Sequence, residues 1–168
     1  MRRALLAALL ALAAQAGAAP RAVHGDFSWE EPKGWIARDA WVSAVPSYTL
    51  LDGDATLSVT LYRAGNPLFA DAKAYRAHRL AARGGGRKPK RSEDAATASG
   101  RAEVWDQDYD ESVSAVHGKG KPAAAMRERF AILERGGKFW VVSVKAPRHA
   151  FDAAKKAFSA ALASFRVP

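Results

Sequence analysis

The sequence contains no cysteine, and this absence excludes several classes of protein at once. Without a thiol there is no disulfide, no thiolate nucleophile, no cysteine-ligated zinc or iron–sulfur cluster, and no cysteine-anchored lipid. The stability of the folded chain must therefore come from its hydrophobic core.

Recognisable catalytic motifs are also missing. No G-x-S-x-G or S-x-x-K motif occurs in the chain, and its four histidines, His24, His78, His117 and His149, are not at metal-ligand spacing. We therefore predict a protein that is not an enzyme and that uses no cofactor. A small hydrolytic or metal-dependent enzyme on the same fold is the alternative.

Length and composition are those of one globular domain. The chain has 168 residues, of which 49% are hydrophobic and 26% are charged. These fractions are near globular averages and exclude wholesale disorder, collagen and coiled coil. Basic residues exceed acidic ones by a net charge of +9, which points to an anionic partner.

The N-terminal segment has the pattern of a secretory signal peptide. A cationic head at Arg2 and Arg3 precedes an uncharged Ala/Leu run over residues 4–14, and small residues follow at 15–20. We predict a signal peptide over residues 1–18 and one mature domain over 19–168, periplasmic or secreted. The apolar run is shorter than the roughly 20 residues of a membrane-spanning helix, so no transmembrane anchor is expected.

Hydrophobic periodicity predicts an α+β domain. Alternation of apolar and polar residues predicts strands at 27–30, 55–63, 101–109, 126–134 and 138–146, the last of them apolar on both faces and therefore central. Helices are expected over 71–83 and from Phe151 to Phe165, where apolar residues recur at helical spacing. Residues 84–100 are rich in glycine and basic residues, and we predict an exposed loop there.

Three segments together resemble the PsbP-like superfamily. They are FSWEEPKGW at residues 27–35, FAILERGGKFWVVSVKAP at 130–147, and the ending ASF at 163–165. This superfamily consists of small α/β/α sandwiches and includes bacterial envelope proteins of the DcrB type. The resemblance implies an antiparallel β-sheet flanked by helices, and a non-catalytic accessory or binding role in the cell envelope.

Clustered basic residues are the candidate binding site. Residues 83–91 carry five of them, and a second short segment carries two more: Arg83, Arg87, Lys88, Lys90, Arg91, Lys119 and Lys121. Such clusters attract anionic surfaces through a field that salt weakens. No aromatic residue lies between them, so specific nucleic-acid binding is not indicated. We expect a monomer whose partner is an envelope protein or an anionic surface; the alternative is an ordinary solvated loop in an arginine-rich chain.

Two further patterns allow more than one interpretation. Asp106, Asp108 and Asp110 would lie on one side of a strand, either as ligands of a hard cation or as charges that protect a sheet edge. The glycine and late glutamate of a calcium loop are missing, which favours the edge. The five tryptophans are mostly expected in the core, with Trp41 the most exposed; a sugar-stacking platform is the alternative.

Overall fold

The structure is a computed structural model that describes residues 21–23, 25–40, 45–81, 87–111 and 124–168. The predicted signal peptide lies outside these residues. In chain order the elements are β1 (Arg21–Val23), β2 (Phe27–Trp29), β3 (Ile36–Ala40), β4 (Ser47–Asp52), β5 (Ala55–Tyr62), α2 (Ala72–Leu80), β6 (Lys90–Thr97), β7 (Gly100–Glu111), β8 (Ala124–Arg135), β9 (Lys138–Pro147) and α3 (Phe151–Ser164).

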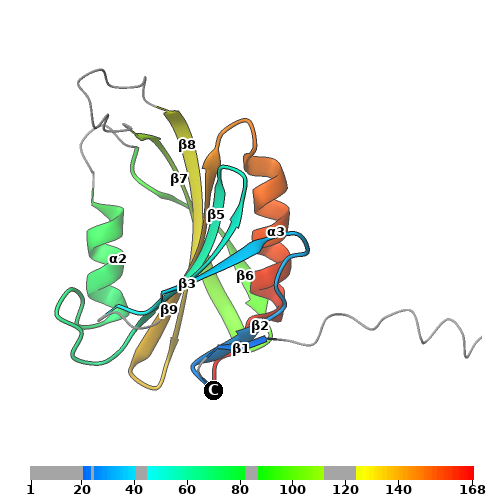
Figure 1. Ribbon diagram of the computed structural model, residues 1–168. Coiled ribbons are helices and arrows are strands. Elements are labelled where there is room, and N and C mark those ends of the chain that lie inside the picture. Colours follow the sequence, from blue (N-terminus) through cyan, green and yellow to red (C-terminus); the bar gives the residue numbers. More distant parts are fainter. Residues whose placement is uncertain (1–20, 24, 41–44, 82–86, 112–123) are drawn as a thin grey trace, which may run out of the picture.

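One antiparallel sheet forms the centre of the domain. Its strands lie in the order β3-β4-β5-β9-β8-β7-β6, while β1 and β2 pair separately as a short ribbon. Helix α3 packs on one face of the sheet and α2 lies over the other, so the domain has three layers (Figure 1). The predicted fold class, an antiparallel sheet flanked by helices, is confirmed.

Strand β9 is central, as its two apolar faces predicted. Trp140, Val142 and Val144 lie in the larger core cluster beneath α3, whereas Phe139 and Val141 belong to a smaller cluster on the α2 side. The predicted hairpin with β8 is also confirmed. It turns at Gly136 and Gly137, whose φ angles of 57° and 74° favour glycine.

Helix α3 and the residues after it close the larger core. The buried helix residues are those that the helical spacing predicted, namely Phe151, Ala154, Phe158, Ala161 and Leu162. Beyond the helix, Phe165 is fully buried and stacks on Phe27 with 5.2 Å between ring centroids. The backbone of Arg166 bonds to Ser28, which fixes β2 beside the C-terminal end of α3.

Helix α2 begins as the sequence predicted. The side chain of Asp71 caps it by accepting a hydrogen bond of 2.7 Å from the backbone N–H of Ala74. The helix contributes Ala72 and Tyr75 to the smaller core cluster. The predicted end of the helix at residue 83 is wrong, because α2 ends at Leu80 and Ala81 has an extended backbone; Gly84 itself lies outside the described residues. No helix in the described part of the chain is long and apolar enough to cross a membrane.

Two predictions about the middle of the chain are wrong. Residues 90–97 form strand β6 rather than a loop, and β6 pairs with β7 through a hairpin at Thr97 and Gly100. Most of its side chains are exposed, so it shows no apolar alternation, and backbone hydrogen bonds to β7 hold it in place. Because β6 forms the sheet edge, the aspartates of β7 do not lie on an edge strand.

Candidate functional site

A basic hollow lies between strands β6–β8 and the first turn of α3. It has a volume of about 380 Å³ and is lined by Arg87, Lys88, Lys90, Arg91, Ser92, Asp106, Gln107, Asp108, Arg127, Arg129, Phe151, Asp152 and Lys155. Seven of these side chains are basic and three are acidic. The hollow therefore has an excess of positive charge in one concave place.

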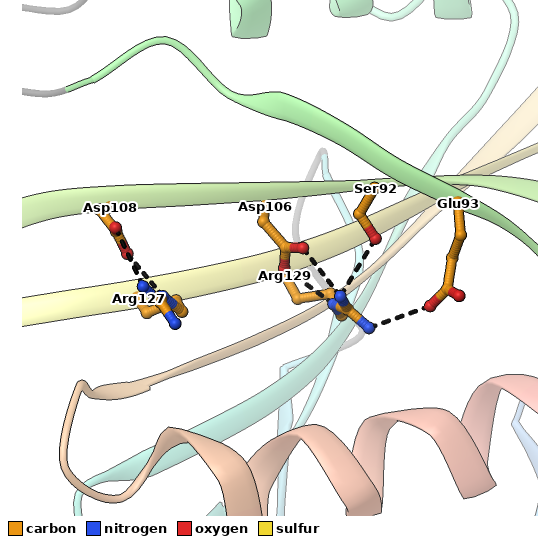
Figure 2. Close-up of polar contacts among 6 residues, drawn as sticks. All are labelled: Ser92, Glu93, Asp106, Asp108, Arg127 and Arg129. Carbon is orange, nitrogen blue, oxygen red and sulfur yellow. Dashed lines mark hydrogen bonds and ion pairs between the residues drawn. The ribbon is translucent and has the colours of Figure 1, made fainter.

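Two cross-strand ion pairs form the floor of the basic hollow. Strand register places Asp106 opposite Arg129 and Asp108 opposite Arg127. Each arginine bonds its aspartate through two nitrogens, at 2.8 and 2.8 Å for Arg129 and at 2.6 and 3.1 Å for Arg127 (Figure 2). These bidentate pairs hold the guanidinium planes in fixed orientations.

Arg129 is the most deeply buried charge of the floor, with a side chain that is 6% exposed. The Nη2 group that bonds Asp106 also donates to Ser92 at 3.1 Å, and the remaining nitrogen, Nη1, donates to Glu93 at 3.2 Å (Figure 2). A register shift in β6 lies at these residues, between Arg91 and Glu93. A bulge of this kind re-aims side chains, which explains how two successive residues reach one guanidinium.

The pKa of the Asp108 carboxyl is lowered, first by its hydrogen bond with Arg127. Burial opposes this effect, while the charges of Arg127, Arg148 and Arg87 add to it. A lowered pKa in the folded state means that the pair stabilises the fold above the ordinary value of 3.8. That stabilisation disappears as the pH falls through the folded-state pKa.

We therefore expect Asp108→Asn to make the free energy of unfolding less dependent on pH in the acid range. Between about pH 5 and pH 2 the wild-type free energy of unfolding should fall more steeply than that of the variant, because asparagine does not titrate. Urea denaturation across this range measures the difference. Parallel curves would show that the Asp108–Arg127 pair adds no pH-dependent stability.

Four basic side chains at the hollow, unlike those of the floor, make no ion pair within the described part of the chain. They are Arg87, Lys88, Lys90 and Lys155, whereas Arg91 is paired with Asp94 at 2.6 Å. The backbone of Arg87 is anchored to β7, because its N–H donates to the carbonyl of Asp108 and its carbonyl accepts from the side chain of buried Gln107. Three of the unpaired charges are therefore exposed on or directly before β6, and the fourth, Lys155, is half-buried on α3.

The structure brings part of the sequence-predicted site together and adds to it. Of the seven predicted residues, Arg87, Lys88, Lys90 and Arg91 line the basic hollow, while Arg83, Lys119 and Lys121 lie outside the described residues. The sequence analysis missed Arg127, Arg129 and Lys155. The sequence did contain a signal for the two arginines, namely a D-x-D spacing at 106–108 and an R-x-R spacing at 127–129. When two such segments pair as antiparallel strands, each aspartate lies opposite an arginine.

The structure also places the other residues that the sequence analysis considered as metal ligands, catalytic groups or sugar-stacking residues. Two of the three aspartates in β7 are engaged by arginines, and the described residues contain no cluster of three metal-ligating side chains. His78 lies beside the ring of Phe69, and His149 is exposed. Trp29 and Trp140 are buried, and Trp35 and Trp105 pack against the two cores. His24, His117 and Trp41 lie outside the described residues.

Comparisons with known proteins identify the fold. No protein-family model matches the chain, and no curated protein matches it. The solved structure of the Saccharomyces cerevisiae Ran-binding protein Mog1p superposes with a TM-score of 0.50 and 16% identity, covering 88% of this chain and 94% of Mog1p. The chain has the Mog1/PsbP-like fold. This confirms the fold that the resemblance to the PsbP-like superfamily implied.

Three further solved structures match with TM-scores below 0.50. CyanoP of Synechocystis sp. PCC 6803 gives 0.49 at 17% identity, covering 89% of this chain and 91% of CyanoP. LpqN, described as involved in cell envelope biogenesis of Mycobacterium tuberculosis, gives 0.41 at 13% identity, covering 89% and 90%. A Bacteroides thetaiotaomicron protein gives 0.47 at 11% identity; 84% of this chain is covered, but it spans only 45% of that longer protein.

Proposed function

We propose that the protein is an exported, non-catalytic binding module of the cell envelope, and that its basic hollow holds an anionic surface of the partner. The observation that carries the proposal is the set of four unpaired cations, Arg87, Lys88, Lys90 and Lys155, around one hollow. A folded protein gains little stability from unpaired like charges held close together. An anionic partner would relieve that repulsion.

The chemistry of the basic hollow supports binding rather than catalysis. No histidine is among the described residues that line it, and Asp106 and Asp108 form ion pairs with arginines. Arginine stays protonated at every physiological pH, so the floor presents a fixed field and not a proton donor or acceptor. Mog1p, which shares the fold, is described as a Ran-binding protein and is thus an example of binding on this scaffold.

Phosphate is the anion that this arrangement suits best. The guanidinium group of Arg87, which makes no ion pair in the described part of the chain, can bind phosphate oxygens in a bidentate manner, and the unpaired lysines add point charges around it. The hollow also borders the first turn of α3 at Phe151 and Asp152, where the positive end of the helix dipole lies. With the signal peptide predicted over residues 1–18, the phosphates that an exported chain meets are those of phospholipid headgroups.

Vesicle co-sedimentation tests the proposed function. The mature chain should bind vesicles of phosphatidylglycerol and phosphatidylcholine but not vesicles of phosphatidylcholine alone, and binding should weaken between about 50 and 300 mM salt as phosphate contacts are screened. A poly-glutamate peptide tests an acidic protein surface in the same buffers. Binding to the peptide alone would move the partner from lipid to protein, and binding to neither probe would contradict the proposal.

A further inference from the structure

A second hollow lies on the opposite face of the sheet, beside α2, with a volume of about 570 Å³. Six hydroxyl side chains from three neighbouring strands line it, namely Ser47, Thr49, Thr56, Ser58, Thr60 and Ser143. Strand alternation produces this lining, because Leu57, Val59 and Leu61 of the same strand point into the core beneath α3. We call this second concavity the hydroxyl hollow.

The charges of the hydroxyl hollow occur mostly in pairs. Arg79 of α2 lies 2.7 Å from Glu128, and Lys145 lies 3.1 Å from Glu111. Asp110 is the remaining charged residue in the lining. Unlike the basic hollow, this one therefore has almost no net charge, and it offers little attraction to an anion.

Arg79 leaves a hydrogen-bond donor unused beside this lining. Its side chain is only 12% exposed, and its guanidinium carbon lies 4.5 Å from the ring centroid of Phe130. The Nε atom is buried and has no hydrogen-bond partner among the described residues. A buried donor without an acceptor is costly, so a small shift of the Arg79 side chain that brings this donor to an acceptor oxygen of a ligand in the hollow would be favoured.

We infer that the hydroxyl hollow binds a neutral, hydroxyl-rich small molecule of the saccharide class. A ligand hydroxyl both donates and accepts, as do the serine and threonine hydroxyls that would meet it. Paired charges favour a ligand without net charge, and the volume lies within the range of about 300–1,000 Å³ that is usual for small-molecule sites.

Tyr109 adds an aromatic wall to the hydroxyl hollow. Burial raises the pKa of its phenol, and the charges of Glu128 and Glu111 raise it further, so the group stays a neutral donor over the physiological range. The ring offers an apolar face beside hydroxyl partners, a combination that suits the mixed surface of a sugar. None of these residues belongs to the basic hollow except Gln107, so this inference stands independently of the proposed function.

An NMR titration tests the inference. Amide spectra of the mature protein are recorded with maltose, cellobiose, lactose and sucrose, each raised through the millimolar range. At least one disaccharide should shift amides of β4, β5 and β9 in a saturable manner. No shift with any of the four sugars, or shifts confined to β6 and the start of α3, would overturn the inference.

Matched variants locate the binding. The triple variant Thr49→Val, Thr56→Val and Thr60→Val removes three hydroxyls while keeping the side-chain shape and the strand preference. It should weaken sugar binding at least about tenfold, because three hydrogen bonds are lost. Ser159→Ala removes an exposed hydroxyl from the outer side of α3 and should leave the affinity unchanged. Equal affinities of the triple variant and the wild type would contradict the site.

Discussion

Replacing Arg87, Lys88, Lys90 and Lys155 by serine should weaken binding to phosphatidylglycerol vesicles by about three orders of magnitude. A basic residue close to an anionic membrane surface contributes about 1 kcal/mol, so the loss of four amounts to about 4 kcal/mol. These four side chains make no ion pair in the described part of the chain, so their removal should leave the fold unchanged. Co-sedimentation at low salt measures the change in affinity, and thermal unfolding verifies the fold.

A control variant that loses the same number of charges elsewhere distinguishes an effect of the basic hollow from an effect of the net charge of the chain. Lys33, Lys73, Arg101 and Lys156 are exposed and lie outside the basic hollow, and like the first set they comprise one arginine and three lysines. Their replacement by serine should weaken vesicle binding far less. If both variants lose affinity equally, attraction comes from the overall charge of the chain and the basic hollow is not a site.

Arg129→Met should lower the free energy of unfolding by about 3 kcal/mol, the low end of the cost of breaking a buried ion pair, because Arg129 is buried but the Asp106 side chain left without its partner is 30% exposed. Asp106 would lose both of its hydrogen bonds to the guanidinium, and Ser92 and Glu93 would each lose one. A domain of ordinary stability has about 5–15 kcal/mol in total, so the loss is large. Urea denaturation measures it.

The double variant Arg129→Met and Asp106→Leu tests the reason for this loss. With both charged partners replaced by apolar residues, the half-buried carboxylate of Asp106 is no longer left unpaired, and much of the stability should return. Glu93 can rehydrate, because its side chain is 60% exposed. A double variant as unstable as Arg129→Met would show that packing of the arginine stem, not its charge, stabilises this part of the sheet.

Elements with an apolar pattern could be predicted from the sequence. Strand β9 is apolar on two faces because it is covered on both sides, and α3 shows helical spacing because one of its faces is buried. Strand β6 could not be found in this way. Its side chains from Lys90 to Asp94 are exposed, and its place in the sheet depends on backbone pairing with β7. Backbone pairing alone produces no alternation of apolar and polar residues in the sequence.

The candidate site was predictable only in part, for a similar reason. Arg87, Lys88, Lys90 and Arg91 are neighbours in the chain, so their clustering is visible in the sequence. Lys155 enters the same hollow because α3 crosses the sheet there, and only the three-dimensional packing shows this. The arginines of β8 depend on strand register, which a single sequence specifies only through turn lengths and apolar faces.

The most direct test of the central claim is an NMR titration of the mature protein with glycerol phosphate, the charged fragment of a phosphatidylglycerol headgroup. If the basic hollow holds an anion, amides at residues 87–91 and at the start of α3 should shift together, and the shifts should shrink as salt is added. Glycerol alone should not shift the amides at residues 87–91 or at the start of α3. Phosphate-dependent shifts spread over the whole surface, or centred on β4, β5 and β9, would contradict the account.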